Sequence, residues 1–137
     1  MLNENNVRDI LINYLEGKKH KIISSCDTNS KGIDIIALDL KTKNELHIEV
    51  KGETSSKKHT ARYGKPFDSK QIRTHISRAV FSAMKVISLK PVGSKTVAAI
   101  ALPKTKGHVS EFDNVKKAVK KLNIKIFWVD EKTVSEE

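Results

Sequence analysis

The sequence contains a single cysteine, Cys26, so no disulfide can form within the chain and no multi-cysteine metal site exists. Aromatic residues make up only 5% of it, which excludes a platform on which successive bases of a single strand would stack. No apolar run approaches the length that crosses a bilayer, and the polar N-terminus contains no secretory segment. No glycine-rich loop of the Walker or dinucleotide type occurs, which argues against nucleotide-driven chemistry. We therefore expect a cytoplasmic protein with no membrane partner.

Positive charge is what the sequence has in excess. Its 26 Lys and Arg residues outnumber 16 Asp and Glu residues, which gives a formal net charge of +10. Such an excess on a short chain favours a polyanionic partner, of which nucleic acid is the commonest. A ribosome-associated protein would show the same charge, so the charge alone does not decide the function. The length of 137 residues and the apolar content of 38% predict one globular domain, residues 1–137.

The spacing of apolar residues predicts an α/β fold. Segments with a period of 3.6 residues are expected to be helices, and short alternating or uniformly apolar segments are expected to be strands. Their order is α-β-β-β-α-β followed by an additional α-β, which implies a mixed central sheet flanked by helices. A polar loop is expected at residues 52–67, and residues 135–137 are expected to fray. The predicted elements are a helix at 3–16, strands at 21–25, 33–40 and 45–51, a helix at 68–88 with Asp68 as its N-cap, a strand at 96–102, a helix at 111–122 and a strand at 124–129.

Each predicted helix has an apolar stripe that should face the core. Gly17 is placed to end the first helix. The inward residues are expected to be Val7, Ile10, Leu11, Tyr14 and Leu15 in the first helix, Ile72, Ile76, Ala79, Val80, Ala83, Met84 and Ile87 in the second, and Val115, Ala118, Val119 and Leu122 in the third.

Charged side chains gather at one end of a predicted hairpin. The side-chain period of two along a strand places Glu49 and Lys51 on the same face. A tight connection at residues 41–44 places Asp34, on the neighbouring strand, roughly opposite residues 50 and 51. Asp34 and Glu49 can then converge, and two carboxylates brought together repel each other unless a cation or a proton lies between them. A hard divalent ion such as Mg²⁺ satisfies that requirement and keeps positions for water and phosphate.

The segments Gly32-Ile33-Asp34 and Glu49-Val50-Lys51 resemble the signature of the PD-(D/E)xK nucleases, which include restriction endonucleases and archaeal Holliday-junction resolvases. The resemblance covers roughly residues 3–102 and implies a restriction-endonuclease-like αβββαβ core. It also implies a DNA-hydrolysing enzyme that depends on Mg²⁺, with Mn²⁺ as an alternative. Its metal ligands would be Asp34, Glu49 and the main-chain carbonyl of Val50, and Lys51 would be the catalytic lysine. Ile33 stands where proline is often found, but that proline takes no part in the chemistry.

Two further side chains resemble site residues of the same superfamily. Glu4 precedes Val7 by three residues, so it continues the apolar stripe and resembles a glutamate that many members place near the metal. An acidic residue is also favoured at a helix N-terminus by the macrodipole, which is a purely structural explanation for Glu4. Asp9 is the alternative for the same role, although it lies off the stripe. Gln71 resembles a glutamine that orients the metal-bound water and phosphate in some members, whereas His75 on the same polar stripe is expected to be solvated.

Basic residues around the predicted site are expected to bind the phosphates of duplex or branched DNA. One site per chain addresses one strand, so we expect a homodimer. Two other interpretations stay open: a non-catalytic nucleic-acid-binding module that keeps the fold, and an RNA-directed or ribosome-associated domain whose acidic pair is structural. The residues expected to contact DNA are Lys57, Lys58, Arg62 and Lys65 in the polar loop and Lys70, Arg73 and Arg78 on the long helix.

Overall fold

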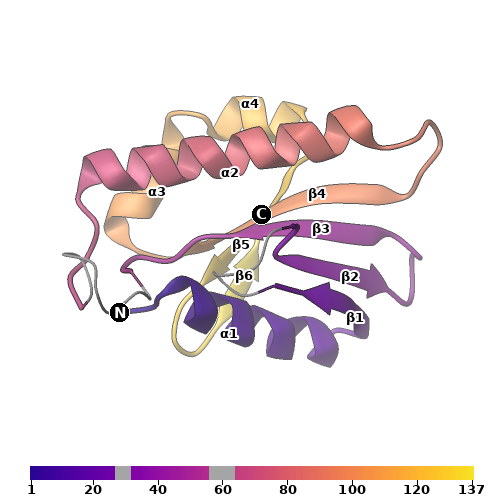
Figure 1. The fold of residues 1–137 in the computed structure, drawn as a ribbon, viewed down its shortest axis with the longest axis horizontal. Helices are drawn as coiled ribbons and strands as arrows, with labels where there is room; N and C mark the ends of the chain where they lie inside the picture. Colours follow the sequence, from indigo (N-terminus) through magenta and orange to yellow (C-terminus); the bar gives the residue numbers. More distant parts are fainter. Residues whose placement is uncertain (27–31, 56–63) are drawn as a thin grey trace.

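Six strands form one mixed sheet, in which they lie side by side in the order in which they occur in the chain (Figure 1). They are β1 (His20–Ser25), β2 (Ile35–Asp39), β3 (Glu45–Val50), β4 (Thr96–Pro103), β5 (Lys125–Val129) and β6 (Val134–Glu136). The computed structural model describes residues 1–26, 32–55 and 64–137. Strands β1 to β3 are antiparallel, β3 to β5 are parallel, and β6 is antiparallel to β5.

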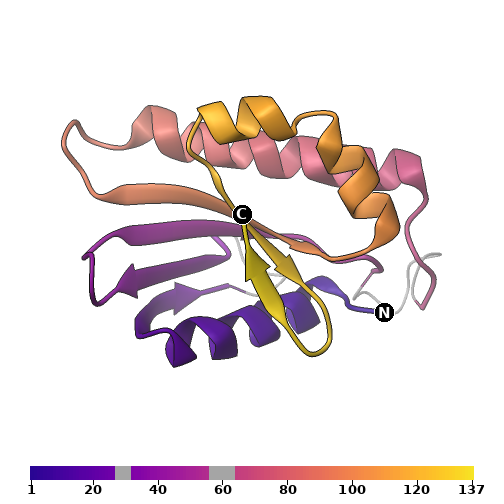
Figure 2. The same ribbon diagram turned by 180° about the vertical axis from the view of Figure 1, so that it is seen from behind.

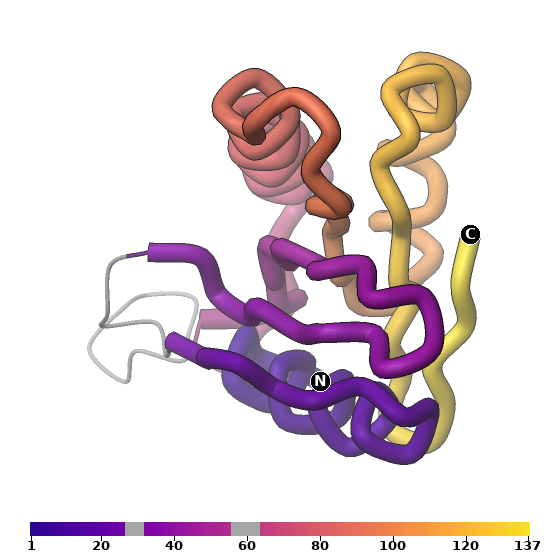
Figure 3. Tube along the Cα trace, turned by 90° about the vertical axis from the view of Figure 1, so that its right-hand side faces the viewer, coloured from indigo at the N-terminus to yellow at the C-terminus, as the bar shows by residue number. Residues whose placement is uncertain are grey.

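Helices cover both faces of the sheet (Figures 1 and 2). They are α1 (Glu4–Gly17), α2 (Ser69–Leu89), α3 (Lys106–Asp113) and α4 (Lys116–Lys121). Helix α1 packs on one face, and the other three pack on the opposite face. In the end-on view of Figure 3, α2 and α4 lie on the same side of the sheet. The expected α/β class, with a mixed sheet flanked by helices, is confirmed.

Helix α1 forms as its sequence pattern predicts. Asn3 and Asn6 close a capping box, in which each side chain accepts a hydrogen bond from the backbone of the other. Val7, Leu11 and Leu15 are fully buried against the strands, and the rest of the predicted stripe packs partly against the same core. The helix ends at Gly17 as expected. None of the helices in the described part of the chain combines the length and apolar character of a membrane-crossing segment.

Helix α2 is the crossover that connects the parallel strands β3 and β4. Its predicted N-cap is confirmed, because the side chain of Asp68 accepts a hydrogen bond from Gln71 N at 2.8 Å. The prediction is wrong for Met84, which is 45% exposed. Met84 follows buried Ala83 by one residue, about 100° around the helix, and therefore faces solvent on the side of Phe81. The fully buried residues of the stripe are Ile72, Ile76, Ala79 and Ala83.

The single helix predicted at residues 111–122 is instead two helices, α3 and α4. Helix α3 starts earlier than predicted because the side chain of Thr105 caps it, accepting a hydrogen bond from His108 N at 3.0 Å. The helix is interrupted at Asn114 and Val115, which separate α3 from α4. Of the four residues expected to face inward, only Val119 is buried, and the α3 core contact is made by Phe112.

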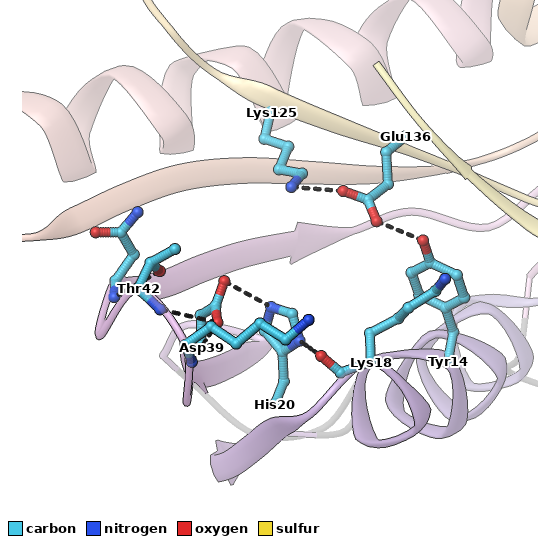
Figure 4. Close-up of polar contacts among 9 residues, drawn as sticks. Tyr14, Lys18, His20, Asp39, Thr42, Lys125 and Glu136 are labelled. Atoms are coloured by element: carbon cyan, nitrogen blue, oxygen red, sulfur yellow. Dashed lines mark hydrogen bonds and ion pairs between the residues drawn. The ribbon is translucent and has the colours of Figure 1, made fainter.

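The C-terminal tail, expected to fray, is paired as β6 with β5. The carboxylate of Glu136 accepts a hydrogen bond from the hydroxyl of Tyr14 on α1 and lies 2.5 Å from Lys125 Nζ (Figure 4). Glu137 accepts a hydrogen bond from Trp128 Nε1 at 2.6 Å. These contacts hold the acidic tail against β5 and α1.

The hairpin between β2 and β3 turns one residue earlier than predicted. Asp39 N donates to Asn44 O at 2.8 Å, so the loop is residues 40–43 rather than 41–44. The side chain of Asp39 stabilises this loop by accepting hydrogen bonds from its backbone, including Thr42 N at 3.3 Å (Figure 4). Ile35 pairs with Ile48, so the same register places the preceding residue, Asp34, opposite Glu49. The predicted position was opposite residues 50 and 51.

Candidate active site

Two carboxylates meet at the end of the sheet where β2 begins and β3 ends. Asp34 directly precedes β2, and Glu49 lies one residue before the end of β3. Asp34 is fixed at two points: its backbone oxygen accepts a hydrogen bond from Cys26 N, and its Oδ2 accepts one from Val50 N, both at 2.8 Å. The carboxyl groups of Asp34 and Glu49 lie close enough together that each changes the pKa of the other.

Two buried carboxylates this close repel each other unless a proton or a cation lies between them. Burial raises the pKa of both Asp34 and Glu49, and the nearby charge of Asp34 raises the pKa of Glu49 further. The Val50 N–H and the Lys51 ammonium both stabilise the charge of Asp34 and oppose the rise of its pKa. Both shifts favour retention of a proton in the pair, and a cation between the two carboxylates would take the place of that proton.

A lysine and a third carboxylate lie beside this pair. Lys51 Nζ is 3.4 Å from Glu49 Oε1, and the lysine side chain is only 15% exposed. Glu4, from the first turn of α1, has its pKa raised to about 7, first by burial and then by the charges of Asp34 and Glu49. Lys51 and Arg8 lower the pKa of Glu4 and partly offset these effects. Glu4, Asp34 and Glu49 therefore form one electrostatic unit, the acidic cluster.

Glu4 reaches the strands because the chain directly after β3 packs against the start of α1. Asn3 and Thr54 form a parallel β-bridge between the two segments. Gly52 makes the approach possible: a Cβ there would lie 2.4 Å from Glu4 N, closer than any real contact. Only glycine leaves room for a second backbone at that distance.

The oxygen donors of the acidic cluster fit a hard divalent cation. Asp34 and Glu49 supply carboxylate oxygens, and Val50 supplies a carbonyl oxygen. The N–H and C=O of a strand residue face the same neighbour, so the Val50 carbonyl lies on the side of Asp34, to which its N–H donates. In the described ranges, no three His, Cys, Asp or Glu side chains already form a metal-ligand set. An ion held by this pair would use the backbone oxygen and water as further ligands, as Mg²⁺ commonly does.

Known proteins provide no relative from which to transfer a function. The chain matches no protein-family model, and no curated protein or solved structure is significantly similar to it. The function is therefore inferred from the acidic cluster, Lys51 and the residues around them.

Two predicted site residues have other partners. Asp9 is exposed and accepts hydrogen bonds from the Arg8 side chain at 3.2 Å, so Glu4 is the α1 carboxylate that joins the cluster. The side chain of Gln71 closes the α2 capping box, accepting a hydrogen bond from Asp68 N at 3.0 Å. This contact gives Gln71 a structural role, and its role in orienting water stays a prediction.

The predicted DNA-binding residues lie in different environments. Arg73 is exposed and forms an ion pair with Glu111 at 3.2 Å, which links α2 to α3. Contact of these residues with DNA stays a prediction. Lys65, Lys70 and Arg78 are exposed, and Lys57, Lys58 and Arg62 lie outside the described residues.

Sequence reasoning missed two residues near the cluster. Arg8 lies one helical turn after Glu4 and lowers the pKa of both Glu4 and Asp34; the i, i+4 spacing of opposite charges could have indicated it. His75 was expected to be solvated but is half-buried against the ring of Phe67. Burial and the charge of Lys51 lower its pKa, which keeps the imidazole neutral near the lysine.

Proposed function

We propose that the protein is a metal-dependent endonuclease that hydrolyses DNA phosphodiester bonds. The observation that carries this proposal is the meeting of Asp34 and Glu49, both with raised pKa, beside Lys51. Paired buried carboxylates cost stability, and a site for a cation and a phosphate explains why they are together. The motif resemblance to PD-(D/E)xK nucleases supports the proposal, as does the αβββαβ order from α1 to β4. We assign these elements to a restriction-endonuclease-like core on the same grounds.

The roles of the residues follow from their positions. Asp34, Glu49 and the Val50 carbonyl would hold Mg²⁺ or Mn²⁺, which polarises a phosphate oxygen and lowers the pKa of water. The Lys51 ammonium, on the same strand face as Glu49, stabilises the negative charge that develops on the phosphate in the transition state. Glu4, whose carboxyl group interacts with Asp34 and Glu49, would hold water beside the cation.

The rest of the molecule offers means to hold the substrate. The net charge of +10 attracts the DNA backbone, and Lys65, Lys70 and Arg78 are exposed cations that can contact phosphates. Each chain has one acidic cluster, so cleavage of both strands of a duplex or branched DNA would require a homodimer.

Cleavage assays test the proposal directly. Plasmid, linear and four-way-junction DNA would be incubated with the protein in Mg²⁺, Mn²⁺ or EDTA, and we expect cleavage with either metal and none in EDTA. Asp34→Asn, Glu49→Gln and Lys51→Met should each lower the rate by about 100-fold or more. Asp9→Asn is the matched control, because it removes an exposed carboxylate of α1 outside the cluster and should cleave at the wild-type rate.

Two results would replace the proposal with another function. Tight DNA binding by a folded wild-type protein that cuts nothing in either metal would indicate a non-catalytic nucleic-acid-binding module. Preferential binding of RNA over DNA of the same length would indicate an RNA-directed domain in which the carboxylate pair is structural.

A further inference from the structure

A cavity of about 510 Å³ opens beside the acidic cluster, between the C-terminal half of α2 and strands β3 and β4. We call it the α2 groove. Glu49 forms part of its wall, so the groove adjoins the carboxylate pair. Its volume lies within the range of about 300–1,000 Å³ that is typical of small-ligand sites. The remaining wall is largely apolar and includes Ile33, Ala83, Val86, Leu89 and Ala99.

Two basic residues also line the groove. Lys85 and Lys90 both contribute to its lining, and Lys90 Nζ donates a hydrogen bond to Thr96 O at 3.4 Å. Thr96 pairs with Glu45, four residues before Glu49, so this ammonium lies roughly 13 Å along the sheet from the carboxylate pair. The groove therefore has an apolar wall, with Glu49 at one end, the Lys90 ammonium at the other, and Lys85 as a second basic lining residue.

We propose that the α2 groove binds a single unpaired nucleotide adjacent to the phosphate that is cut. The aliphatic walls would contact the base, and the two lysines would contact a phosphate further along the same strand. The volume of about 510 Å³ is sufficient for one nucleotide, and a base can enter such a site only after it leaves the stack. The low aromatic content excludes stacking of several bases but not contact of one base with Ala83, Val86 and Leu89.

This inference rests on the proposed nuclease function and specifies its substrate: DNA with a flipped, bulged or single-stranded nucleotide at the cut site. Enzymes that extrude a base bind a duplex more tightly when that base is already unpaired, because the cost of unpairing is removed. A preference for unpaired substrates is therefore the measurable consequence of the groove.

The test compares two labelled DNA duplexes that are identical except for one extra unpaired adenine in the middle of one strand. Binding is measured by fluorescence anisotropy with Mg²⁺ in the Lys51→Met background, so that the DNA stays intact. We expect the bulged duplex to bind about tenfold more tightly than the paired duplex. Ser82→Trp, on a half-buried lining position of α2, fills the groove and should abolish the preference while leaving binding of the paired duplex unchanged.

A charge-matched pair of variants checks the lysines. Lys85→Ala with Lys90→Ala should weaken binding of the bulged duplex by about tenfold. Lys117→Ala with Lys121→Ala, on exposed positions of α4, removes the same charge elsewhere and should change it by about twofold or less. Thermal unfolding of each variant establishes that it is folded.

The outcomes separate the groove from the nuclease function. Equal binding of both duplexes, or a preference that survives Ser82→Trp, overturns the proposed groove even if the wild type cleaves DNA. If the protein prefers the bulged duplex, loses that preference in Ser82→Trp and cuts no DNA, the groove is supported as a nucleotide site and the proposed nuclease function is refuted.

Discussion

Replacing Glu4 by glutamine should stabilise the metal-free protein, and the gain should grow with pH. The folded-state pKa of about 7 lies above the ordinary value of 4.5, so the folded protein retains a proton that the unfolded chain releases. The resulting stability is present below pH 4.5 and is lost as the pH rises through 7. A shift of this size corresponds to about 3 kcal/mol at most, because one pKa unit is about 1.4 kcal/mol. Partial solvation of Glu4 and the loss of its favourable interaction with the α1 dipole reduce the expected gain to about 1–2 kcal/mol at pH 8.

Urea unfolding in EDTA at pH 4 to 8 measures this effect. The wild type and Glu4→Gln should be equally stable at pH 4 and should diverge by 1–2 kcal/mol, about 3–6 °C in Tm, at pH 8. Mg²⁺ should stabilise the wild type and narrow the gap, since a cation compensates the ionised carboxylate. Asp9→Asn, the control on the exposed side of α1, should show no such divergence. A Glu4→Gln protein that is less stable than wild type at pH 8, or a gap that does not change with pH, would refute the placement of Glu4 in the acidic cluster.

Three further perturbations follow from the packing. Gly52→Ala should separate α1 from the end of β3 and lower cleavage by about tenfold or more, whereas Gly17→Ala, with open space around it, should leave cleavage unchanged. Phe112→Ala should lower the free energy of unfolding by about 3–5 kcal/mol in chemical denaturation, and Phe81→Ala, 69% exposed, by less than about 0.5 kcal/mol. Burial lowers the pKa of His108 to about 4, so the contribution of this histidine to wild-type stability should fall as the pH drops from 6.5 to 4. In urea unfolding, His108→Leu should therefore gain stability relative to the wild type over that range; a difference between the two proteins that does not change with pH would contradict the burial of a neutral His108.

The carboxylate pair could be predicted from sequence because it depends on local rules. Alternation along β3 fixes the face of Glu49, and a tight hairpin brings β2 back beside it. The predicted register of β2 and β3 was wrong because Asn44 was expected inside the turn. Its backbone oxygen instead accepts a hydrogen bond from Asp39 N and closes the turn. A difference of one residue in the turn changed the predicted partner of Asp34, although the two carboxylates still meet.

Features set by distant contacts could not be read from local pattern. The approach of Glu4 depends on the meeting of α1 with the chain around Gly52, nearly fifty residues later in the sequence. The tail is a strand because β5 offers it an edge and Tyr14 and Lys125 bind its acidic side chain. The break at Val115 is likewise hidden from periodicity, since each half of the predicted helix has acceptable helical residues.

The order of the strands has a consequence for how the protein folds. Each strand pairs with the strand that precedes it in the chain, so the sheet can grow by one strand at a time as the polypeptide is synthesised. Pairs β1–β2 and β2–β3 close short loops, but β4 must join β3 in parallel after the whole of α2 has intervened. The backbone N–H of Lys51 donates a hydrogen bond to Ala101 O in β4, so this backbone contact of the lysine forms only when β4 joins β3. We expect this parallel pairing to limit the folding rate, and the backbone of the proposed active site to be completed at the same step.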